Sequence, residues 1–238
     1  MICPFFDTIH VRKFTIDFEL QDCLMAKEVR ISDGTIERVA YYLRPLEDLK
    51  EKNVKVVSSE QLADICKVNP AQVRKDLSFF GEFGVRGVGY SVKDLLVQIQ
   101  RILASDREWR LAIVGLDDMG MALVEHKNFL KRGYRFVAAF DYSPDKAGTK
   151  LPSGLIVHSI KEIQDLVHEL NIEIGVLTTP PSKAQEVADM FFEAGIMAIV
   201  NFSTIQLRTP ECCLVKNVDL TLNLDHLAYQ LSKKGESK

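Results

Sequence analysis

The sequence predicts an α/β protein: an N-terminal winged helix-turn-helix domain, a Rossmann-like doubly wound parallel-sheet domain and a C-terminal helix. Three observations support this fold class. The first part of the chain has apolar residues at helical spacing, followed by a glycine-rich segment, residues 81–90. After residue 109, apolar strand-like runs alternate with helical stretches, which is typical of a parallel sheet. The last apolar residues recur at helical spacing again.

The composition excludes several classes of protein. The chain has 238 residues, 47% hydrophobic and 26% charged, which excludes fibrous and wholly disordered proteins. No apolar run reaches the roughly 18 residues of a membrane span, so we expect no membrane association. The net charge is -3, so any DNA-binding surface must be local. Five cysteines without metal-ligand spacing predict no metal site and favour a reducing cytoplasm: Cys3, Cys23, Cys66, Cys212 and Cys213.

Residues 1–29 have no clear period, and we expect them to form an arm outside the first domain. A second methionine, Met25, lies near the end of this stretch. A translation start assigned too early therefore explains the arm as well as a functional tail does. Peptide mass mapping of the native protein distinguishes these alternatives.

Residues 30–90 predict the winged helix-turn-helix domain. Apolar residues recur at three- and four-residue steps from Ile36 to Leu46, which predicts a core-facing helix. A short second helix follows, with serines available to cap its start. Asn69 can cap a third helix whose first residue is Pro70, where the missing N–H costs nothing.

The third helix and the glycine-rich segment form the candidate DNA-binding surface. Four glycines within residues 81–89 predict a tight hairpin with Arg86 at or near its tip. Residues 67–93 carry five basic and two acidic side chains, a local charge of +3. A purely structural three-helix unit is the alternative. In the functional interpretation, these residues contact base edges or phosphates: Gln72, Arg74, Lys75, Ser78 and Arg86.

Residues 91–104 predict a helix that connects the first domain to the second, because Ser91 and Asp94 form a capping-box pattern before an apolar stripe. Residues 105–219 predict the Rossmann-like domain. In a doubly wound sheet the ligand binds outside the carboxyl ends of the strands. The predicted elements are strands at 111–115, 136–141, 172–177 and 197–201, with one helix from Met119 to Lys131.

The segment Gly115–Gly120 occupies the place of a G-x-G-x-x-G dinucleotide loop. Asp141 follows Gly120 by 21 residues, as expected for a carboxylate that binds the adenosine ribose. Asp117 replaces the middle glycine, so its side chain would crowd a pyrophosphate and add a like charge. Two interpretations stay open: a nucleotide site of altered or weak affinity, and a scaffold that binds no dinucleotide.

An enzyme would need a catalytic base or nucleophile at a strand end, and the sequence shows no such constellation. His126 and His158 have no obvious carboxylate or cysteine partner in sequence. We therefore expect no enzyme, and a nicotinamide-dependent oxidoreductase is the alternative.

Residues 220–238 predict a C-terminal helix and tail. Leucines recur there at helical spacing and need a surface on which to be buried: Leu220, Leu224, Leu227 and Leu231. A partner subunit is one such surface, so we expect a dimerisation helix.

The run QVRKDLSFFGEFGVRGVGY, residues 72–90, resembles the Rex family of bacterial redox-sensing transcriptional repressors. The similarity covers roughly residues 35–232 and includes Val137–Asp141, Ala194–Ile196, Asn201–Phe202 and Val218–Leu220. The resemblance implies a homodimer that binds a palindromic double-stranded DNA operator and senses the NADH/NAD+ ratio. It also implies release of the operator when NADH binds, and a C-terminal helix exchanged between subunits.

The resemblance assigns roles by position. Arg74, Lys75 and Ser78 would lie on the recognition helix, and Arg86 in the wing. The dinucleotide would contact three groups of residues: Gly115, Leu116, Asp117, Asp118, Met119 and Gly120 at the pyrophosphate, Asp141 at the ribose, and Thr178, Pro180, Asn201 and Phe202 at the nicotinamide end. Family members usually have Gly-Ala-Gly-Asn-Leu-Gly in this loop. The departure bears on NADH sensing alone, so a Rex-like paralogue without dinucleotide control is the alternative.

Overall fold

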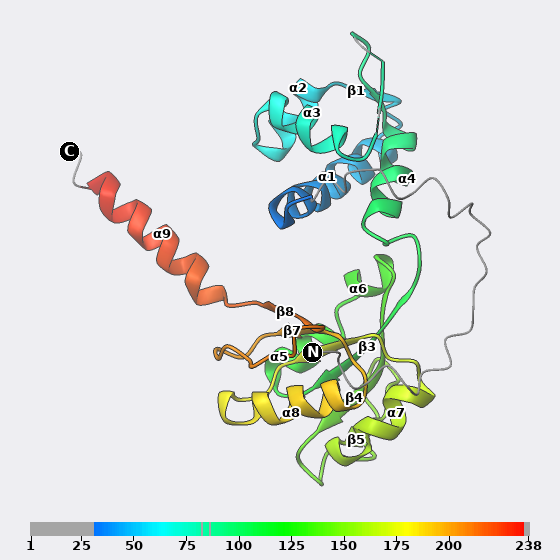
Figure 1. Cartoon of the computed structure of the whole chain (residues 1–238), viewed down its shortest axis with the longest axis vertical. Coiled ribbons are helices and arrows are strands. Elements are labelled where there is room, and N and C mark those ends of the chain that lie inside the picture. Colours follow the sequence, from blue (N-terminus) through cyan, green and yellow to red (C-terminus); the bar gives the residue numbers. More distant parts are fainter. Residues whose placement is uncertain (1–30, 82, 86, 236–238) are drawn as a thin grey trace. The chain divides into compact units, whose positions relative to one another are not determined.

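The computed structural model describes residues 31–81, 83–85 and 87–235 (Figure 1). The expected arm, residues 1–29, and the expected wing residue Arg86 lie outside the described residues. The predicted fold class is confirmed, because a helical part with a small hairpin precedes a parallel sheet and a final helix.

The chain divides into two compact units, Met1–Arg107 and Glu108–Lys238. The helix expected to connect them is α4, Val92–Ile102. Four of its apolar side chains are buried in the core of the first unit: Val92, Leu95, Leu96 and Ile99. The helix is therefore part of that unit, and the division falls after Arg107.

Local capping signals set the helix starts of the first unit. The side chain of Ser58 accepts a hydrogen bond from the Gln61 N–H, and that of Asn69 accepts one from the Ala71 N–H. Tyr42, on the first helix, is fully buried in a core to which all the helices of this unit contribute. The elements are α1 (Asp33–Glu51), β1 (Val56–Val57), α2 (Ser59–Cys66), α3 (Pro70–Ser78), β2 (Tyr90–Ser91) and α4.

The expected wing is a short hairpin. Strands β1 and β2 pair antiparallel. Between α3 and β2 the chain turns back on itself, and the Val85 N–H donates to the Gly89 carbonyl at 3.1 Å. The glycine-rich segment therefore forms the tight turn that its composition predicts.

The second unit is built on six parallel strands in the order β5-β4-β3-β6-β7-β8. Successive crossovers run one way from β3 and then the other way from β6, so the order reverses between these two strands. Ligands of doubly wound sheets bind at this reversal. The strands are β3 (Trp109–Val114), β4 (Tyr134–Asp141), β5 (Val157–Ser159), β6 (Ile174–Leu177), β7 (Ala198–Asn201) and β8 (Leu214–Asn217).

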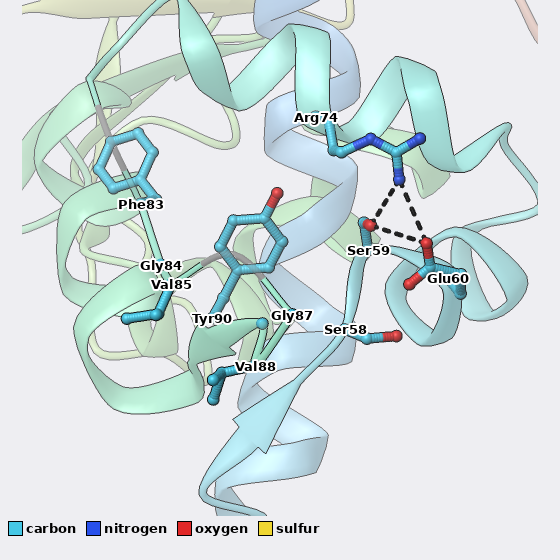
Figure 2. Close-up of a pocket in the computed structure, with 11 residues that line it drawn as sticks. Ser58, Ser59, Glu60, Arg74, Phe83, Gly84, Val85, Gly87, Val88 and Tyr90 are labelled. Atoms are coloured by element: carbon cyan, nitrogen blue, oxygen red, sulfur yellow. Dashed lines mark hydrogen bonds and ion pairs between the residues drawn. The ribbon is translucent and has the colours of Figure 1, made fainter.

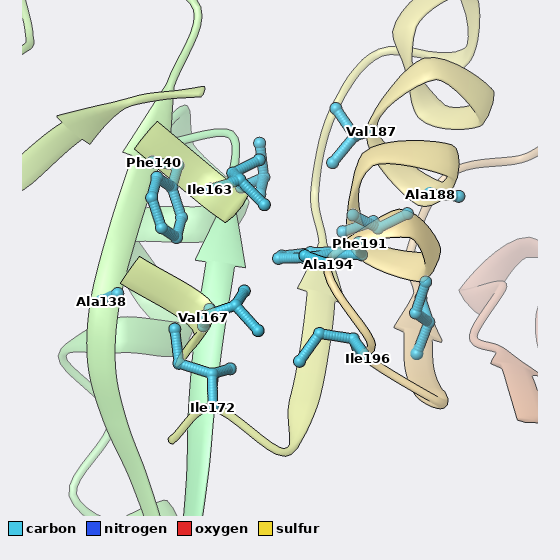
Figure 3. Close-up of a cluster of buried hydrophobic side chains, with 14 residues drawn as sticks. Ala138, Phe140, Ile163, Val167, Ile172, Val187, Ala188, Phe191, Ala194 and Ile196 are labelled. Atoms are coloured by element: carbon cyan, nitrogen blue, oxygen red, sulfur yellow. The ribbon is translucent and has the colours of Figure 1, made fainter. Parts of the chain in front are cut away.

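Both faces of the sheet are covered. Ala112 and Val114 of β3 belong to one hydrophobic cluster, and Leu111 and Ile113 belong to another, as expected from the alternation of side chains along a strand. Figure 3 shows the first cluster, in which Phe191 of α8 (Pro181–Glu193) lies among apolar side chains of the sheet and of α7 (Ile163–Glu169).

One helix boundary differs from the prediction. The single helix expected from Met119 to Lys131 is wrong, because the chain forms α5 (Asp118–Val124) and α6 (Asn128–Lys131). The bend between them lets the ring of Phe129 pack edge-on against Phe136 of β4, with ring centroids 5.5 Å apart. A short 3-10 helix, Ile160–Glu162, and α9 (Leu220–Gly235) complete the unit.

Candidate functional site

The third helix of the first unit presents a polar face. Arg74, Lys75 and Ser78 are exposed, while Val73 and Leu77, four residues apart, are buried. The Ser78 hydroxyl donates to the Lys75 carbonyl at 2.7 Å. Helix α3 follows α2 after a short turn, so these side chains occupy the recognition-helix position of a helix-turn-helix.

Arg74 lies beside a cavity of about 380 Å³ between the start of α2 and the hairpin (Figure 2). Its Nη1 lies 2.8 Å from the Ser59 hydroxyl and 3.2 Å from the Glu60 carboxylate. Both charged side chains are more than half exposed, so this pair contributes little to stability. The guanidinium is held at the edge of the polar face and stays accessible.

Gln72 differs from the other expected DNA-contacting residues. Its side-chain amide donates to the buried carboxylate of Asp76 at 2.7 Å. Arg38 and Tyr42 donate to the same carboxylate. Burial alone would raise the pKa of Asp76, but these three hydrogen-bond donors outweigh it and hold the pKa below its ordinary value. The Gln72 amide nitrogen is therefore engaged in a hydrogen bond within α3, to Asp76, in this structure.

In the second unit, the loops after β3 and β6 are packed together at the reversal point. A Cβ at Gly115 would lie 2.9 Å from the Thr178 carbonyl group, and one at Gly120 would lie 1.9 Å from the Gly115 oxygen. The Thr178 hydroxyl is 3.0 Å from the Val114 oxygen and 2.6 Å from that of Gly115. The fold therefore requires both outer glycines of the expected dinucleotide loop.

Asp117 stands in this loop without backbone strain. Its φ of -82° is available to any residue, and its side chain is 74% exposed. The ammonium of Lys146 lies 3.1 Å from its carboxylate. The position therefore needs no glycine for its own backbone. Of the other loop residues, Leu116 is buried, whereas Asp118 and Met119 are exposed.

Asp141, at the end of β4, is buried and holds the loop. Its Oδ2 accepts hydrogen bonds from the Leu116 N–H at 2.9 Å and from the Lys146 ammonium at 3.0 Å. Its Oδ1 accepts from the Ser143 N–H at 2.9 Å. Burial would raise the pKa of Asp141, but these donors lower it overall. The carboxylate keeps acceptor capacity on Oδ1 for a further donor such as a ribose hydroxyl.

The expected nicotinamide-end residues lie at the end of β7 and in the loops after β6 and β7. Asn201 is buried, and its amide nitrogen donates to the Ile205 carbonyl and the Asn217 side chain at 2.9 and 2.8 Å. Phe202 packs against the hydrophobic cluster that contains Leu111 and Ile113, and Pro180 is exposed just before α8. The Asn201 amide therefore shapes its own loop.

Two hydroxyls that were not among the expected dinucleotide contacts lie in the same loops. Thr179 and Ser203 are 4% and 7% exposed, and neither hydroxyl has a hydrogen-bond partner. A buried hydroxyl without a partner is costly, so both are candidate contacts for a polar ligand. Their signal in the sequence was a hydroxyl residue directly after Thr178 and directly after Phe202.

Within the part of the chain that the structure describes, His, Cys, Asp and Glu side chains form no group of three or more that could hold a metal ion. None of the described helices is both long enough and apolar enough to cross a membrane.

Comparisons with known proteins match segments of both units. Residues 30–78 match a family described as "Putative DNA-binding protein N-terminus", and residues 106–205 match one described as "CoA binding domain". Over 206 residues the chain is 51% identical to the redox-sensing transcriptional repressor Rex of Syntrophobacter fumaroxidans, which covers 87% of this chain and 98% of that relative. The chain belongs to the Rex family. The Rex of Solidesulfovibrio magneticus is 45% identical, with 87% and 93% of the two chains covered.

Solved Rex structures share the fold. RSP, a Rex-family repressor crystallised with β-NAD+ and operator DNA, has a TM-score of 0.82 and 34% identity, covering 86% of this chain and 94% of its own. Its complex with β-NADH has a TM-score of 0.79 and 31% identity, covering 87% and 97%. The Rex resemblance of the sequence is therefore confirmed across the helical and the sheet units.

Proposed function

We propose that this Rex protein is a cytoplasmic homodimer that represses transcription from a palindromic operator and releases that operator when NADH binds. The observation that carries the proposal is the pairing, in one chain, of an exposed basic recognition helix with a glycine-bounded loop at the reversal point of a Rossmann sheet. RSP, crystallised with β-NAD+ and operator DNA, supports both halves.

Operator binding would use α3 in the major groove. Arg74 and Lys75 supply guanidinium and ammonium donors for base edges or phosphates, and Ser78 supplies a hydroxyl. Arg86, which lies outside the described residues, would contact the minor groove or its phosphates from the wing. Because these contacts neutralise phosphates, operator affinity should fall steeply as the salt concentration rises.

The carboxyl edge of the sheet fits a dinucleotide. Gly115 and Gly120 let the loops after β3 and β6 pack closely at this edge, because a Cβ at either position would meet backbone atoms, and Asp141 offers a carboxylate oxygen to a ribose hydroxyl. The unpaired hydroxyls of Thr179 and Ser203 would bind polar groups at the nicotinamide end. Thr178 and Asn201 would act by shaping the loops there.

Helix α9 would form the dimer. Its apolar side chains are 55% to 69% exposed, a cost that burial against a second copy of the chain would remove: Leu220, Leu222, Leu224, Leu227, Tyr229 and Leu231. We propose that the helix is exchanged between the subunits, so that α9 of each subunit buries its leucines against the other subunit.

NADH would act as an effector and not as a substrate. An effector shifts the dimer only by its differential affinity for the DNA-binding and DNA-free arrangements, and a coupling of about 1–3 kcal/mol gives roughly 5- to 150-fold control. A Rex protein that represses without dinucleotide control is the second candidate, and the acidic Asp117 is the observation that favours it.

Calorimetric titration of the protein with NADH and with NAD+ tests this function, followed by addition of each ligand to a fluorescence assay with an operator selected from random-sequence duplexes. We expect NADH to bind and to release the operator. A scrambled duplex is the control for sequence specificity. Intact operator binding without any response to NADH would establish the second candidate, and absence of sequence-specific DNA binding would overturn both.

A further inference from the structure

Lys146 contacts three acceptors around the expected dinucleotide loop. Its ammonium lies 3.1 Å from Asp117 Oδ1, 3.0 Å from Asp141 Oδ2 and 3.2 Å from the Leu116 carbonyl oxygen. An ammonium has three N–H donors, so each one has an acceptor here. The lysine thus joins the residue that replaces the middle glycine to the carboxylate expected at the ribose.

The Lys146 ammonium reduces the repulsion between the Asp117 carboxylate and an anionic ligand. A carboxylate in the loop repels an anionic pyrophosphate, and a bound ammonium offsets that charge where it arises. Lys146 comes from the segment after β4 and is only partly exposed, while its partner Asp141 has a side chain that is 9% exposed. Pairs of this kind are screened less by solvent than fully exposed ion pairs are.

The lysine also braces the loop. It donates to the Leu116 carbonyl, while Asp141 accepts from the Leu116 N–H at 2.9 Å. The backbone of one loop residue is therefore held on both sides by one ion pair. Burial alone would lower the pKa of Lys146, but hydrogen bonds to the two carboxylates raise it overall, so the ammonium stays charged at neutral pH.

We propose that Lys146 is the positioning residue that lets this loop accept an anionic dinucleotide in spite of Asp117. The inference rests on the proposed function, because it concerns the same NADH site. Lys146 offsets part of the charge of Asp117, because it pairs with Asp141 as well, and it fixes the Leu116 backbone. Together these two effects make the loop less repulsive to an anionic dinucleotide.

A double-mutant cycle tests the assignment. NADH affinity is measured by calorimetry for the wild type, Lys146→Met, Asp117→Gly and the double variant. We expect Lys146→Met to weaken NADH binding roughly five- to tenfold in the wild-type background and by less than about twofold beside Asp117→Gly. Asp117→Gly alone should strengthen binding, because the loop then presents no carboxylate to the pyrophosphate, while Lys146 keeps its ion pair with Asp141.

Three controls separate positioning from folding. Lys161→Met removes an exposed lysine elsewhere in the second unit and should leave NADH affinity unchanged. Lys146→Arg keeps the positive charge and should retain most of the affinity. Operator binding without NADH should stay within error of the wild type for Lys146→Met, which shows that this variant is folded.

Equal effects of Lys146→Met in both backgrounds would overturn the inference while NADH sensing stands. Binding of NADH by Asp117→Gly but not by the wild type would also overturn it, since Lys146 would then fail to offset Asp117. Absence of NADH binding in both proteins would overturn the proposed dinucleotide site itself.

Discussion

The guanidinium of Arg38 makes two hydrogen bonds to the carboxylate of Asp76, each at 2.8 Å. The two residues lie on α1 and α3, and the Asp76 side chain is fully buried while that of Arg38 is 33% exposed. Planar two-point pairing of this kind fixes direction as well as distance. The pair therefore fixes the orientation of α3 relative to α1. It acts on the buried side of α3, whereas the exposed side carries Arg74, Lys75 and Ser78.

Replacement of Asp76 by asparagine should lower the free energy of unfolding by about 1–3 kcal/mol, because the amide has one acceptor oxygen where the buried carboxylate has two, so donors of Arg38, Tyr42 or Gln72 lose their acceptor. Urea denaturation of the full-length protein measures this difference. Asp64→Asn is the matched control, since Asp64 is exposed on α2. Equal stability of the two variants would show that the Arg38 pair contributes nothing.

The same pair predicts a dependence of stability on pH. The folded protein holds the pKa of Asp76 below its ordinary value of 3.8, so the unfolded chain binds the proton more strongly. This stabilisation is complete above the ordinary pKa and is lost as the pH falls through the folded value. The stability difference between the wild type and Asp76→Asn should therefore be constant down to about pH 5 and shrink below about pH 4. A difference that grows on acidification would contradict the assignment.

Arg74→Ala should weaken operator binding roughly tenfold or more and reduce the salt dependence of log affinity by about one unit, as loss of a phosphate or base contact does. Its melting temperature should hardly change, because the side chain is exposed. Fluorescence anisotropy over a range of salt concentrations measures both quantities. Arg101→Ala, at the end of α4, is the control. If Arg74→Ala and Arg86→Ala both leave affinity unaltered, the groove assignment is wrong.

Glu60→Gln should strengthen binding to unrelated duplexes more than binding to the operator. The substitution removes a carboxylate 3.2 Å from Arg74 and so frees the guanidinium to meet any phosphate. The measured quantity is the ratio of operator affinity to scrambled-duplex affinity, which we expect to fall about threefold. An unchanged ratio would mean that Glu60 does not restrain Arg74.

The double substitution Leu227→Glu and Leu231→Glu should dissociate the dimer, because it would place two unpaired carboxylates in the proposed interface. Sedimentation equilibrium measures the association state. Gln230→Glu, on the same helix, is the matched control and should remain dimeric. Removal of residues 220–238 should have the same effect as the double substitution, and a dimeric, fully active truncated chain would refute the exchanged helix.

Elements with local signals could be predicted closely. Asn69 and Pro70 specify the start of α3, because a cap and a proline act within one turn of the chain. The edge strands β5 and β8 were missed. Leu214 of β8 is 75% exposed, and the strand Leu214–Asn217 has no apolar and polar alternation in its sequence, so only its pairing with β7 defines it.

The candidate site could be predicted in outline only. Gly115, Gly120 and Asp141 follow a known spacing, and the structure brings them to one edge of the sheet. Lys146 follows no such spacing. It lies 29 residues from Asp117 in the chain, and only the parallel pairing of β3 with β4 places the segments that carry them side by side.

Gly115, Gly120 and position 117 differ in what they tolerate. A methyl group at either glycine would meet backbone atoms, whereas the side chain at 117 projects outward from an unstrained residue. Substitutions at either glycine should therefore disrupt folding and be removed by selection. Substitutions at position 117 should change the charge presented to a ligand and leave the fold intact. A lineage can retune how strongly its repressor answers the dinucleotide by single substitutions at this position, without passing through an unstable ancestor.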